Sequence, residues 1–439
     1  MSRAAGGDLP DPAGFADPCA RPLVTADIEG VGGRIKQRPE DFLVEEIPIT
    51  QPCGSGEHIW MLVEKRDMST LHMARVVARH FSVPLRDVGW AGLKDRRAIT
   101  RQVISVRTPG RRPEDFPQLQ HDQIAVLWVD LHDRKLRRGH LRGNRFSIRI
   151  RDVQPTGALI AQRALQRLRV SGLPGLIGSQ RFGAAGVNHL VGRALLRGES
   201  QLVLDLLLGP LEGGAIHPES RRLYAEGRYA EALEALPKAA RTERSALGPL
   251  SRGASAQKAV GAIPVPERRF LITAAQSAVF NDLLRARMDD GSWDRCVEGD
   301  LAMKLDGRAT FAVTGADIAT GELDARLARF EISPTGPMWG PQMQRATGAV
   351  DAMELEVLAR FGLSPEALEA FPGAARGDIE GQRRPLRVPV VDPEVEGGVD
   401  EHGAFIRCAF DLPRGSFATE VMREIMKPAD AAALTGGDF

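Results

Sequence analysis

The chain has 439 residues, of which 43% are hydrophobic, so it is long enough for two or three domains with buried cores. Its 58 basic and 57 acidic residues leave a net charge of +1, which argues against a surface that is basic all over but leaves room for a local basic face. No stretch approaches the roughly 20 apolar residues of a membrane helix, and residues 1–30 lack the pattern of a secretory signal. The four cysteines are widely spaced without a CxxC pair, so we expect reduced thiols, a cytoplasmic location and no zinc ribbon.

The segment from Gly33 to about Val170 has the pattern of an α+β domain. One helix is predicted over Ser69–Phe81, because its apolar residues recur on one face and Ser69 or Thr70 can cap its first turn. A second helix is predicted over residues 158–170. Apolar runs of strand length predict strands over residues 42–47, 58–63, 100–106, 124–131 and 145–150.

The composition changes between about Val187 and Arg383, where Leu, Ala, Arg and Glu dominate. Helices are expected over residues 202–208, 224–236, 273–288 and 349–361, with a strand-rich patch over 300–313. A strand over 405–412 and a helix over 417–426 follow. We therefore predict an α+β fold with a mixed or antiparallel sheet, interrupted by a mostly helical inserted domain.

This architecture divides the chain into four parts. Residues 1–30 are expected to be a disordered tail, and residues 431–439 a second tail. Residues 31–200 and 384–430 are expected to form the first domain, and residues 201–383 the inserted domain.

The most distinctive segment runs from Gly89 to Gln102 and reads GWAGLKDRRAITRQ. Asp95 lies there in a loop just before a predicted strand, among Lys94, Arg96 and further cations. A carboxylate in such surroundings stays ionised at neutral pH, which suits a nucleophile or a general base, and the cations also attract phosphate. A surface loop held by salt bridges is the alternative interpretation.

The most basic segment is RKLRRGHLRGNRFSIRIR, residues 134–151, which holds eight Arg or Lys and no Asp or Glu. In a strand, Arg145, Arg149 and Arg151 share one face, opposite an apolar row. The residues before them are predicted to form a basic loop. Such a stripe suits a nucleic-acid backbone, to which affinity falls steeply with salt. The alternative is an exposed strand that its charges keep soluble.

Other signals are weaker. Gly178–Gly183 (GSQRFG) has two glycines around a polar and aromatic core, which is compatible with a functional loop or with a plain turn. The Walker A, HExxH and GxSxG patterns are missing, and His140 and His189 are isolated, so no nucleotide or metal cofactor is indicated.

Together these segments resemble the TruD family of pseudouridine synthases, tRNA enzymes that act on uridine at position 13. Five motifs carry the resemblance in family order: IKQRPEDFLVEE at residues 35–46, AGLKDR and TRQ at 91–96 and 100–102, RRGHLRGNRF at 137–146, QRFG at 180–183, and PRGSFAT with RE at 413–419 and 423–424. Pro334–Pro337 with Trp339 and Gly340 is also similar to the inserted domain of the family.

The resemblance implies a catalytic domain with a TruD-type insertion, a tRNA partner, and a monomer that needs no cofactor, metal or membrane. Asp95 matches the catalytic aspartate, which attacks the nucleoside at ribose C1′ or at uracil C6. The glycosidic bond then breaks, the uracil turns, and C5 rejoins the sugar. The residues expected to support Asp95 are Lys36, Lys94, Ile177, Arg181 and Phe182. Those expected to bind RNA are Arg96, Arg137, Arg138, Arg142 and Arg145.

The fourth motif departs from the family pattern NYFGxQRFG. Gly175 stands at the asparagine position and Ile177 at the phenylalanine position. Loss of the aromatic face removes about 1–3 kcal/mol of base stacking, and loss of the asparagine removes hydrogen bonds that could hold the loop. Three functions therefore remain open: a synthase acting on tRNA, an RNA-binding relative with little or no catalysis, and a synthase acting on another RNA.

Overall fold

The computed structural model describes residues 17–211, 216–373, 377–428 and 432–435. The chain divides into two compact units. We call residues 23–173 and 388–439 the sheet unit, and residues 1–22 and 174–387 the helical unit. Among the described residues, no helix has both the length and the apolar character needed to cross a membrane.

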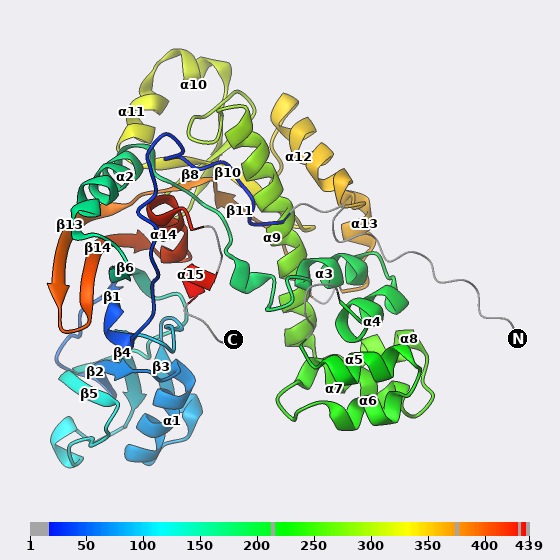
Figure 1. Ribbon diagram of the computed structural model, residues 1–439, viewed down its shortest axis with the longest axis horizontal. Helices are drawn as coiled ribbons and strands as arrows, with labels where there is room; N and C mark the ends of the chain where they lie inside the picture. The colour runs from blue at the N-terminus through cyan, green and yellow to red at the C-terminus, as the bar shows by residue number, and fades with distance from the viewer. Residues whose placement is uncertain (1–16, 212–215, 374–376, 429–431, 436–439) are drawn as a thin grey trace, which may run out of the picture. The chain divides into compact units, whose positions relative to one another are not determined.

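An eight-stranded mixed sheet forms the centre of the sheet unit (Figure 1). The strands follow the order β13-β14-β6-β1-β4-β2-β5, and β3 pairs with β4. Strands β1 and β4 are parallel, and the other pairs are antiparallel. The predicted α+β class with a mixed sheet is therefore confirmed. The strands are β1 (Phe42–Pro48), β2 (His58–Arg66), β3 (Val88–Trp90), β4 (Ile99–Arg107), β5 (Ile124–His132), β6 (Leu141–Arg151), β13 (Val391–Asp400) and β14 (Gly403–Pro413).

Four helices belong to this unit: α1 (Thr70–His80), α2 (Ala158–Ser171), α14 (Ala418–Met426) and α15 (Ala432–Thr435). Helix α1 begins where predicted, because the Ser69 hydroxyl accepts a hydrogen bond from the N–H of His72. The apolar face of α1 packs on β2 and β4, where Met73 and Val77 share a core with Ile104. Helices α2 and α14 cover the apolar residues of β6 and β14 in a second core.

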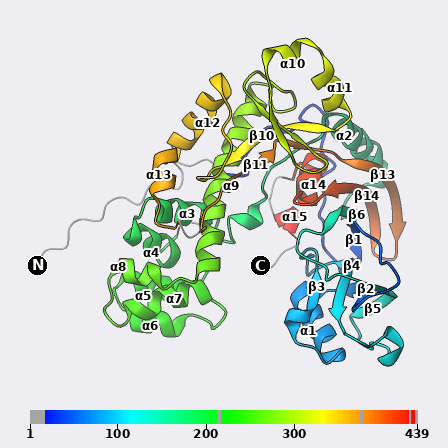
Figure 2. The same ribbon diagram turned by 180° about the vertical axis from the view of Figure 1, so that it is seen from behind.

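The helical unit is built around α9 (Val265–Asp289), and α4 to α8 gather at one end of that helix (Figure 2). Its core joins residues of α3, α9 and α12, among them Leu190, Leu283 and Val357. A four-stranded sheet with the order β11-β10-β8-β9 completes the unit. Its elements are α3 (Asn188–Leu196), α4 (Ser200–Leu208), α5 (Pro218–Ala225), α6 (Tyr229–Ala235), α7 (Arg241–Leu250), α8 (Ala256–Gly261), α10 (Gly315–Ala319), α11 (Glu322–Ala328), α12 (Gly348–Arg360), α13 (Pro365–Ala370), β8 (Leu301–Lys304), β9 (Thr310–Ala312), β10 (Ile332–Met338) and β11 (Gln382–Pro385). Two short strands, β7 (Leu173–Pro174) and β12 (Arg387–Val388), lie where the chain passes between the units.

Two element predictions need correction. The helix predicted over residues 224–236 is two helices, α5 and α6, because Gly227 between them has a φ of 77°, which a helix cannot continue through. The basic loop predicted before residue 145 ends earlier, since β6 begins at Leu141.

The predicted tails are also partly wrong. Residues 1–16, 429–431 and 436–439 lie outside the described residues. Thr25, however, is fully buried, and its N–H donates to a carboxylate oxygen of Glu424 at 3.0 Å. Near the other end, the N–H of Ile35 donates to the carbonyl oxygen of Ala433 in α15. Both ends are therefore tied into the sheet unit by backbone hydrogen bonds.

The observed division of the chain differs from the predicted one. The helical unit runs from residue 174 to 387, whereas the inserted domain was predicted over residues 201–383. Helix α3 lies in the part that was not predicted, and it belongs to the helical unit because Leu190, Val191 and Ala194 pack in one core with Leu271 and Ala275 of α9. The composition change noted above begins at about Val187, after the boundary at residue 174 and before the predicted start at residue 201.

Candidate active site

Asp95 lies at one edge of the large sheet, just before β4. Strand β1 runs parallel to β4, with Leu43 opposite Ile99, so the residues that precede both strands lie at the same edge. Strand β2 is antiparallel to β4 and pairs Lys65 with Thr100. The sheet topology therefore brings three separate chain segments to Asp95.

Lys36, one of the predicted supporting residues, contacts the Asp95 side chain directly. Its ammonium group donates to Oδ1 of Asp95 at 3.0 Å and also lies 4.4 Å from the centre of the Phe42 ring. The Lys36 side chain is 9% exposed, whereas that of Asp95 is 35% exposed. The backbone of Lys36 has a positive φ of 59°, which is uncommon for a residue other than glycine. The carboxylate is thus held at one oxygen while the group remains open to a ligand.

Lys65 is a further lysine at this site, which the sequence did not single out. Its side chain is fully buried, and its ammonium group donates to the backbone carbonyl oxygen of Asp95 at 2.8 Å. Burial lowers the pKa of Lys65 to about 8, although the charge of Asp95 acts in the opposite direction. Only the register of β2 and β4 shows that this residue reaches the loop.

Lys94 does not have the expected position beside the Asp95 carboxylate. Its ammonium group is buried and donates to Oε2 of Glu46 and Oδ1 of Asn144, both at 2.8 Å. Its backbone N–H donates to the hydroxyl of Thr70 at the start of α1. Lys94 therefore anchors the Asp95 loop to β1, β6 and α1. Glu46, Lys94 and Asn144 come from three of the sequence motifs, which explains why those motifs occur together.

The basic loop, which we define as residues 134–140, lies against the Asp95 loop. The N–H of Gly139 donates to the carbonyl oxygen of Ala91 at 2.7 Å, and the Arg138 guanidinium lies 4.7 Å from the centre of the Trp90 ring. Arg414, from the fifth motif, donates to the carbonyl oxygen of Gly139. Four of the predicted RNA-binding residues are exposed here or beside Asp95: Arg96, Arg137, Arg138 and Arg142.

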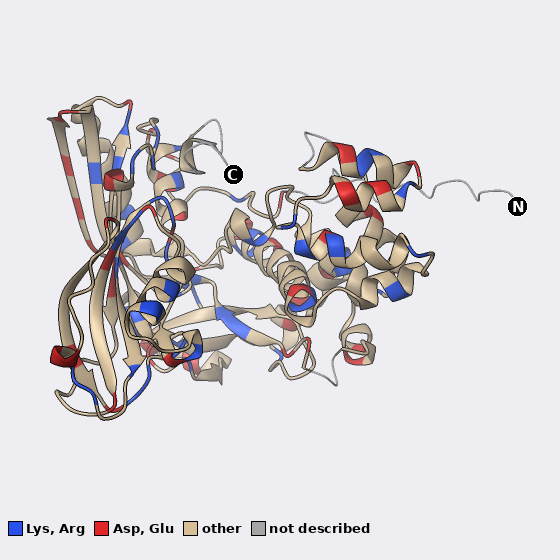
Figure 3. Ribbon diagram, turned by 90° about the horizontal axis from the view of Figure 1, so that it is seen from below, with Lys and Arg blue, Asp and Glu red and all other residues tan. Residues whose placement is uncertain are grey.

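Arg145 and Arg151 lie further along β6 than Arg142 and differ from these residues, because acidic groups of the sheet unit already pair with them. Arg145 donates to Asp411 at 3.0 Å and to Glu394 at 2.6 Å. Arg151 is 2% exposed and is paired with Asp41 and Asp400. Acidic and basic positions lie along these neighbouring strands (Figure 3). The predicted alternation of β6 is confirmed, but Arg145 does not offer the free positive charge expected for RNA binding.

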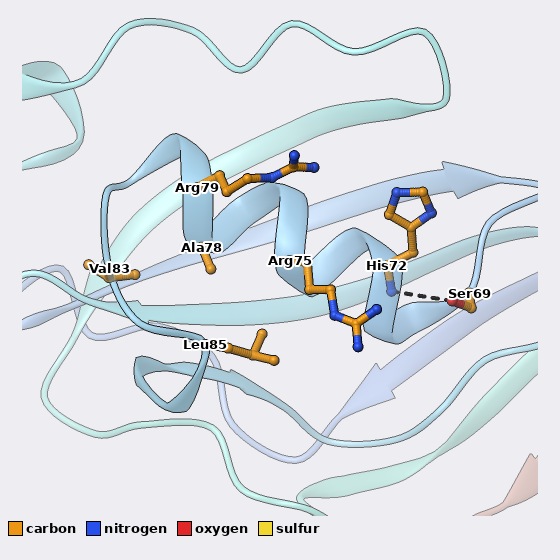
Figure 4. A pocket seen from close by; sticks show the side chains of 7 residues that line it. All are labelled: Ser69, His72, Arg75, Ala78, Arg79, Val83 and Leu85. Carbon is orange, nitrogen blue, oxygen red and sulfur yellow. Dashed lines mark hydrogen bonds between the residues drawn. The ribbon is translucent and has the colours of Figure 1, made fainter. Parts of the chain in front are cut away.

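Two further features of the sheet unit add to the site. Leu93, two residues before Asp95, is 66% exposed, although it is a large apolar side chain. A hollow of about 690 Å³ lies along α1, and His72, Arg75 and Arg79 line it with apolar residues of the following turn (Figure 4). The sequence predicted this helix but not its role, although its polar face carries the cations Arg75 and Arg79.

Gly175 and Ile177 have a physical explanation within the helical unit. A Cβ atom at position 175 would lie 2.4 Å from the carbonyl oxygen of Pro385, so only glycine fits. Asn281 supplies hydrogen bonds to the loop from another element: its Oδ1 accepts from the N–H of Ile177, and its Nδ2 donates to the Ile177 carbonyl oxygen, both at 2.9 Å. The loop is thus held by an asparagine of α9 rather than by one of its own.

The other two predicted residues of the helical unit differ in exposure. Phe182 is 2% exposed and packs edge-on against His189, so its ring is a core residue rather than a stacking platform. Arg181 is half-buried, its guanidinium lies 5.1 Å from the centre of the Phe270 ring, and burial lowers its pKa. Of these two residues, Arg181 alone keeps exposed polar surface.

Comparison with known proteins identifies the relatives of this chain. A family model described as tRNA pseudouridine synthase D (TruD) matches residues 21–425. Proteins named tRNA pseudouridine synthase D are similar throughout: that of Geobacter sulfurreducens is 41% identical over 92% of this chain and 96% of its own length, and that of Thermus thermophilus is 36% identical over 92% of each. A crystal structure from Methanosarcina mazei, described as tRNA pseudouridine synthase D, has a TM-score of 0.79 and 27% identity, and the match covers 95% of this chain and 98% of that one.

Proposed function

Because this chain belongs to the TruD family of tRNA pseudouridine synthases, it isomerises uridine to pseudouridine in tRNA, and we propose that Asp95 is the carboxylate that performs the reaction. The contact between Lys36 and Asp95, in a loop that adjoins exposed arginines, carries this proposal. The target is uridine at position 13 of the tRNA.

The reaction constrains what the site must provide. Uridine and pseudouridine are isomers, so the bond from C1′ to N1 breaks, a bond from C1′ to C5 forms, and the hydrogen of C5 leaves as a proton while N1 gains one. The ionised carboxylate of Asp95 attacks C1′ or C6 of a nucleoside that has left its stack, which costs a few kcal/mol. Lys36 is a positioning residue, because its ammonium group fixes one carboxylate oxygen of Asp95. The exposed side chain of Leu93 offers an apolar contact for the extruded base.

The RNA contacts that offset base extrusion come from the exposed cations around this loop. Arg96, Arg137, Arg138 and Arg142 contact phosphates, and Arg75 and Arg79 of α1 extend the basic surface. Each of these side chains belongs to the sheet unit, so one unit presents both the carboxylate and its phosphate contacts. We assign Arg181 a supporting role as a further cation in the helical unit. The protein acts as a monomer in the cytoplasm.

The departures from the family pattern at Gly175 and Ile177 do not support a function other than pseudouridine formation. The backbone approach to Pro385 explains the glycine, and Asn281 replaces the hydrogen bonds that the family asparagine would make. Ile177 is 5% exposed, so its apolar side chain is buried. The alternative is an RNA-binding relative without catalysis. Such a protein would bind tRNA but leave its uridines unmodified in the following experiment.

The experiment is pseudouridine mapping of tRNA after incubation with the purified protein. The wild type should introduce pseudouridine at position 13, and Asp95→Asn, which keeps the shape of the side chain but removes its charge, should introduce none. Asp122→Asn is the matched control, because Asp122 is exposed in the same unit and should be dispensable. Modification by Asp95→Asn at the wild-type rate would contradict the assignment, and modification at another uridine would contradict the position.

A further inference from the structure

A second group of reactive side chains lies at the far end of β2 from Asp95. Cys53, in the connection between β1 and β2, lies close to His132 and Asp133 at the end of β5. The thiol sulfur, one ring nitrogen of His132 and one carboxylate oxygen of Asp133 all lie within 4.8 Å of one another. The proposed reaction uses none of these groups.

Two histidines face each other at this position of the sheet. His58 of β2 is directly opposite His132 of β5 in the strand register, so their side chains lie on the same face. They are 7% and 8% exposed, and within the described part of the chain Nδ1 of each has no hydrogen-bond partner. Because buried polar atoms are normally paired, these imidazoles retain unused capacity to bind a ligand. Both histidines line a hollow of about 900 Å³ together with Cys53 and Asp133.

We propose that this cluster is a binding site for a zinc-like divalent cation, with Cys53, His132 and Asp133 as ligands and His58 opposite His132 on the neighbouring strand. Thiolate, imidazole and carboxylate are the donors that zinc takes in proteins, usually four in a tetrahedron. The thiolate and the carboxylate carry two negative charges, which balance the two positive charges of the ion. No cation of the hard, oxygen-preferring class suits a sulfur donor as well.

The residues around the cluster orient the proposed ligands. Oδ1 of Asp133 faces His132 at 3.3 Å from Nε2, while Oδ2 of the same carboxylate lies 3.4 Å from Nε of Arg134. The Trp60 ring packs on the imidazole of His132 with its centre 4.2 Å away. The contacts of Arg134 and Trp60 lie outside the ligand set, and such outer contacts fix the direction of a metal ligand. The bound ion would join the connection between β1 and β2 to the residue that precedes the basic loop.

The test uses the full chain, freed of metal by a chelator under reducing conditions and then titrated with Co²⁺. The wild type should develop absorption from thiolate-to-cobalt charge transfer, together with the strong visible bands of a four-coordinate site, and Zn²⁺ should remove both. Cys53→Ala should lose the charge-transfer band, and Asp133→Asn should weaken cobalt binding by at least about 10-fold, which is the loss typical of removing even an outer partner of a metal ligand. Cys19→Ser, which changes a cysteine of the helical unit, should behave as the wild type.

Two results would overturn the site. One is a wild-type protein without the charge-transfer band, and the other is a band of equal strength in Cys53→Ala. Cys53 is exposed in a connecting segment, so its replacement should leave the fold intact, and thermal unfolding of each variant checks this. The readout needs no tRNA, so failure of the metal site is distinguishable from failure of the proposed reaction.

Discussion

Asp95 is held at two of its atoms by two lysines from different parts of the chain. Lys36 binds the carboxylate, and Lys65 binds the backbone carbonyl, so the direction of the side chain and the path of the loop are fixed separately. Lys36 and Asp95 were found from sequence, because both stand in recognisable motifs. Lys65 was not, because it stands at the end of a strand and only the pairing of β2 with β4 brings it to the loop.

The buried position of Lys65 makes the stability of the protein depend on pH. Its pKa in the folded state is about 8, below the ordinary value of 10.5, so the unfolded chain binds more protons between these pH values. The contribution of Lys65 to the free energy of unfolding therefore rises as the pH increases from 8 to 10.5, by about 3 kcal/mol in total. Urea unfolding of the wild type and of Lys65→Met across this range measures the difference between them. A difference that stays constant with pH would show that Lys65 titrates normally.

The close approach of the backbone at Gly175 makes this position sensitive to substitution. Gly175→Ala should lower the free energy of unfolding by about 1–3 kcal/mol, because the new methyl group would collide with the carbonyl oxygen of Pro385. Gly261→Ala is the matched control, since nothing lies within 4 Å of a Cβ atom there. Chemical unfolding of both variants checks this, and equal stability would mean that the backbone at 175 relaxes easily.

Strand β6 shows what the sequence could and could not predict about an element. The alternation of Arg145 to Arg151 with apolar residues correctly predicted a strand with one buried face. The partners of the arginines could not be predicted, because Asp400 and Asp411 lie on strands more than 240 residues away in the chain. From local composition alone, all of residues 134–151 could bind a phosphate backbone. In the structure, the arginines available for this are in the first part of the segment, where Arg137, Arg138 and Arg142 are exposed.

This distinction predicts a difference in the salt dependence of tRNA binding. Replacing Arg137, Arg138 and Arg142 together by Ala should weaken binding and reduce the slope of log affinity against log salt by about 3, one for each lost phosphate contact. Arg145→Gln should leave the slope unchanged, because Asp411 and Glu394 already neutralise that guanidinium. Titrations at several salt concentrations measure both slopes. If Arg145→Gln changed the slope and the triple variant did not, the assignment of the basic loop would be wrong.

Strand β10 was missed for a different reason. Its sequence, ISPTGPM, contains two prolines and a glycine, which normally argue against a strand inside a sheet. All seven residues are nevertheless buried, and the strand pairs with β8 on one side and β11 on the other. The tertiary environment overrides local preference there, and no rule based on neighbours in sequence would have found it.

At the scale of the whole molecule, the ordered motifs predicted the family correctly, and the comparisons confirm it. Four of the five motifs lie in the sheet unit, where residues such as Glu46, Lys94 and Asn144 contact one another. The boundaries of the two units, in contrast, could not be predicted from the sequence. They fall at residues 173 and 387, whereas the composition changes at about Val187 and Arg383.

We propose that one carboxylate in this fold performs the isomerisation and that RNA binding alone does not suffice. Since C1′ becomes attached to C5, each turnover releases the hydrogen of C5 to water. Release of tritium from tRNA labelled at C5 of its uridines therefore counts the reaction directly, and filter binding measures tRNA affinity in parallel. The wild type should release tritium, and Asp95→Asn should release none while its affinity and its salt slope match those of the wild type. Tritium release by Asp95→Asn at the wild-type rate would contradict the account and would place the reactive group elsewhere.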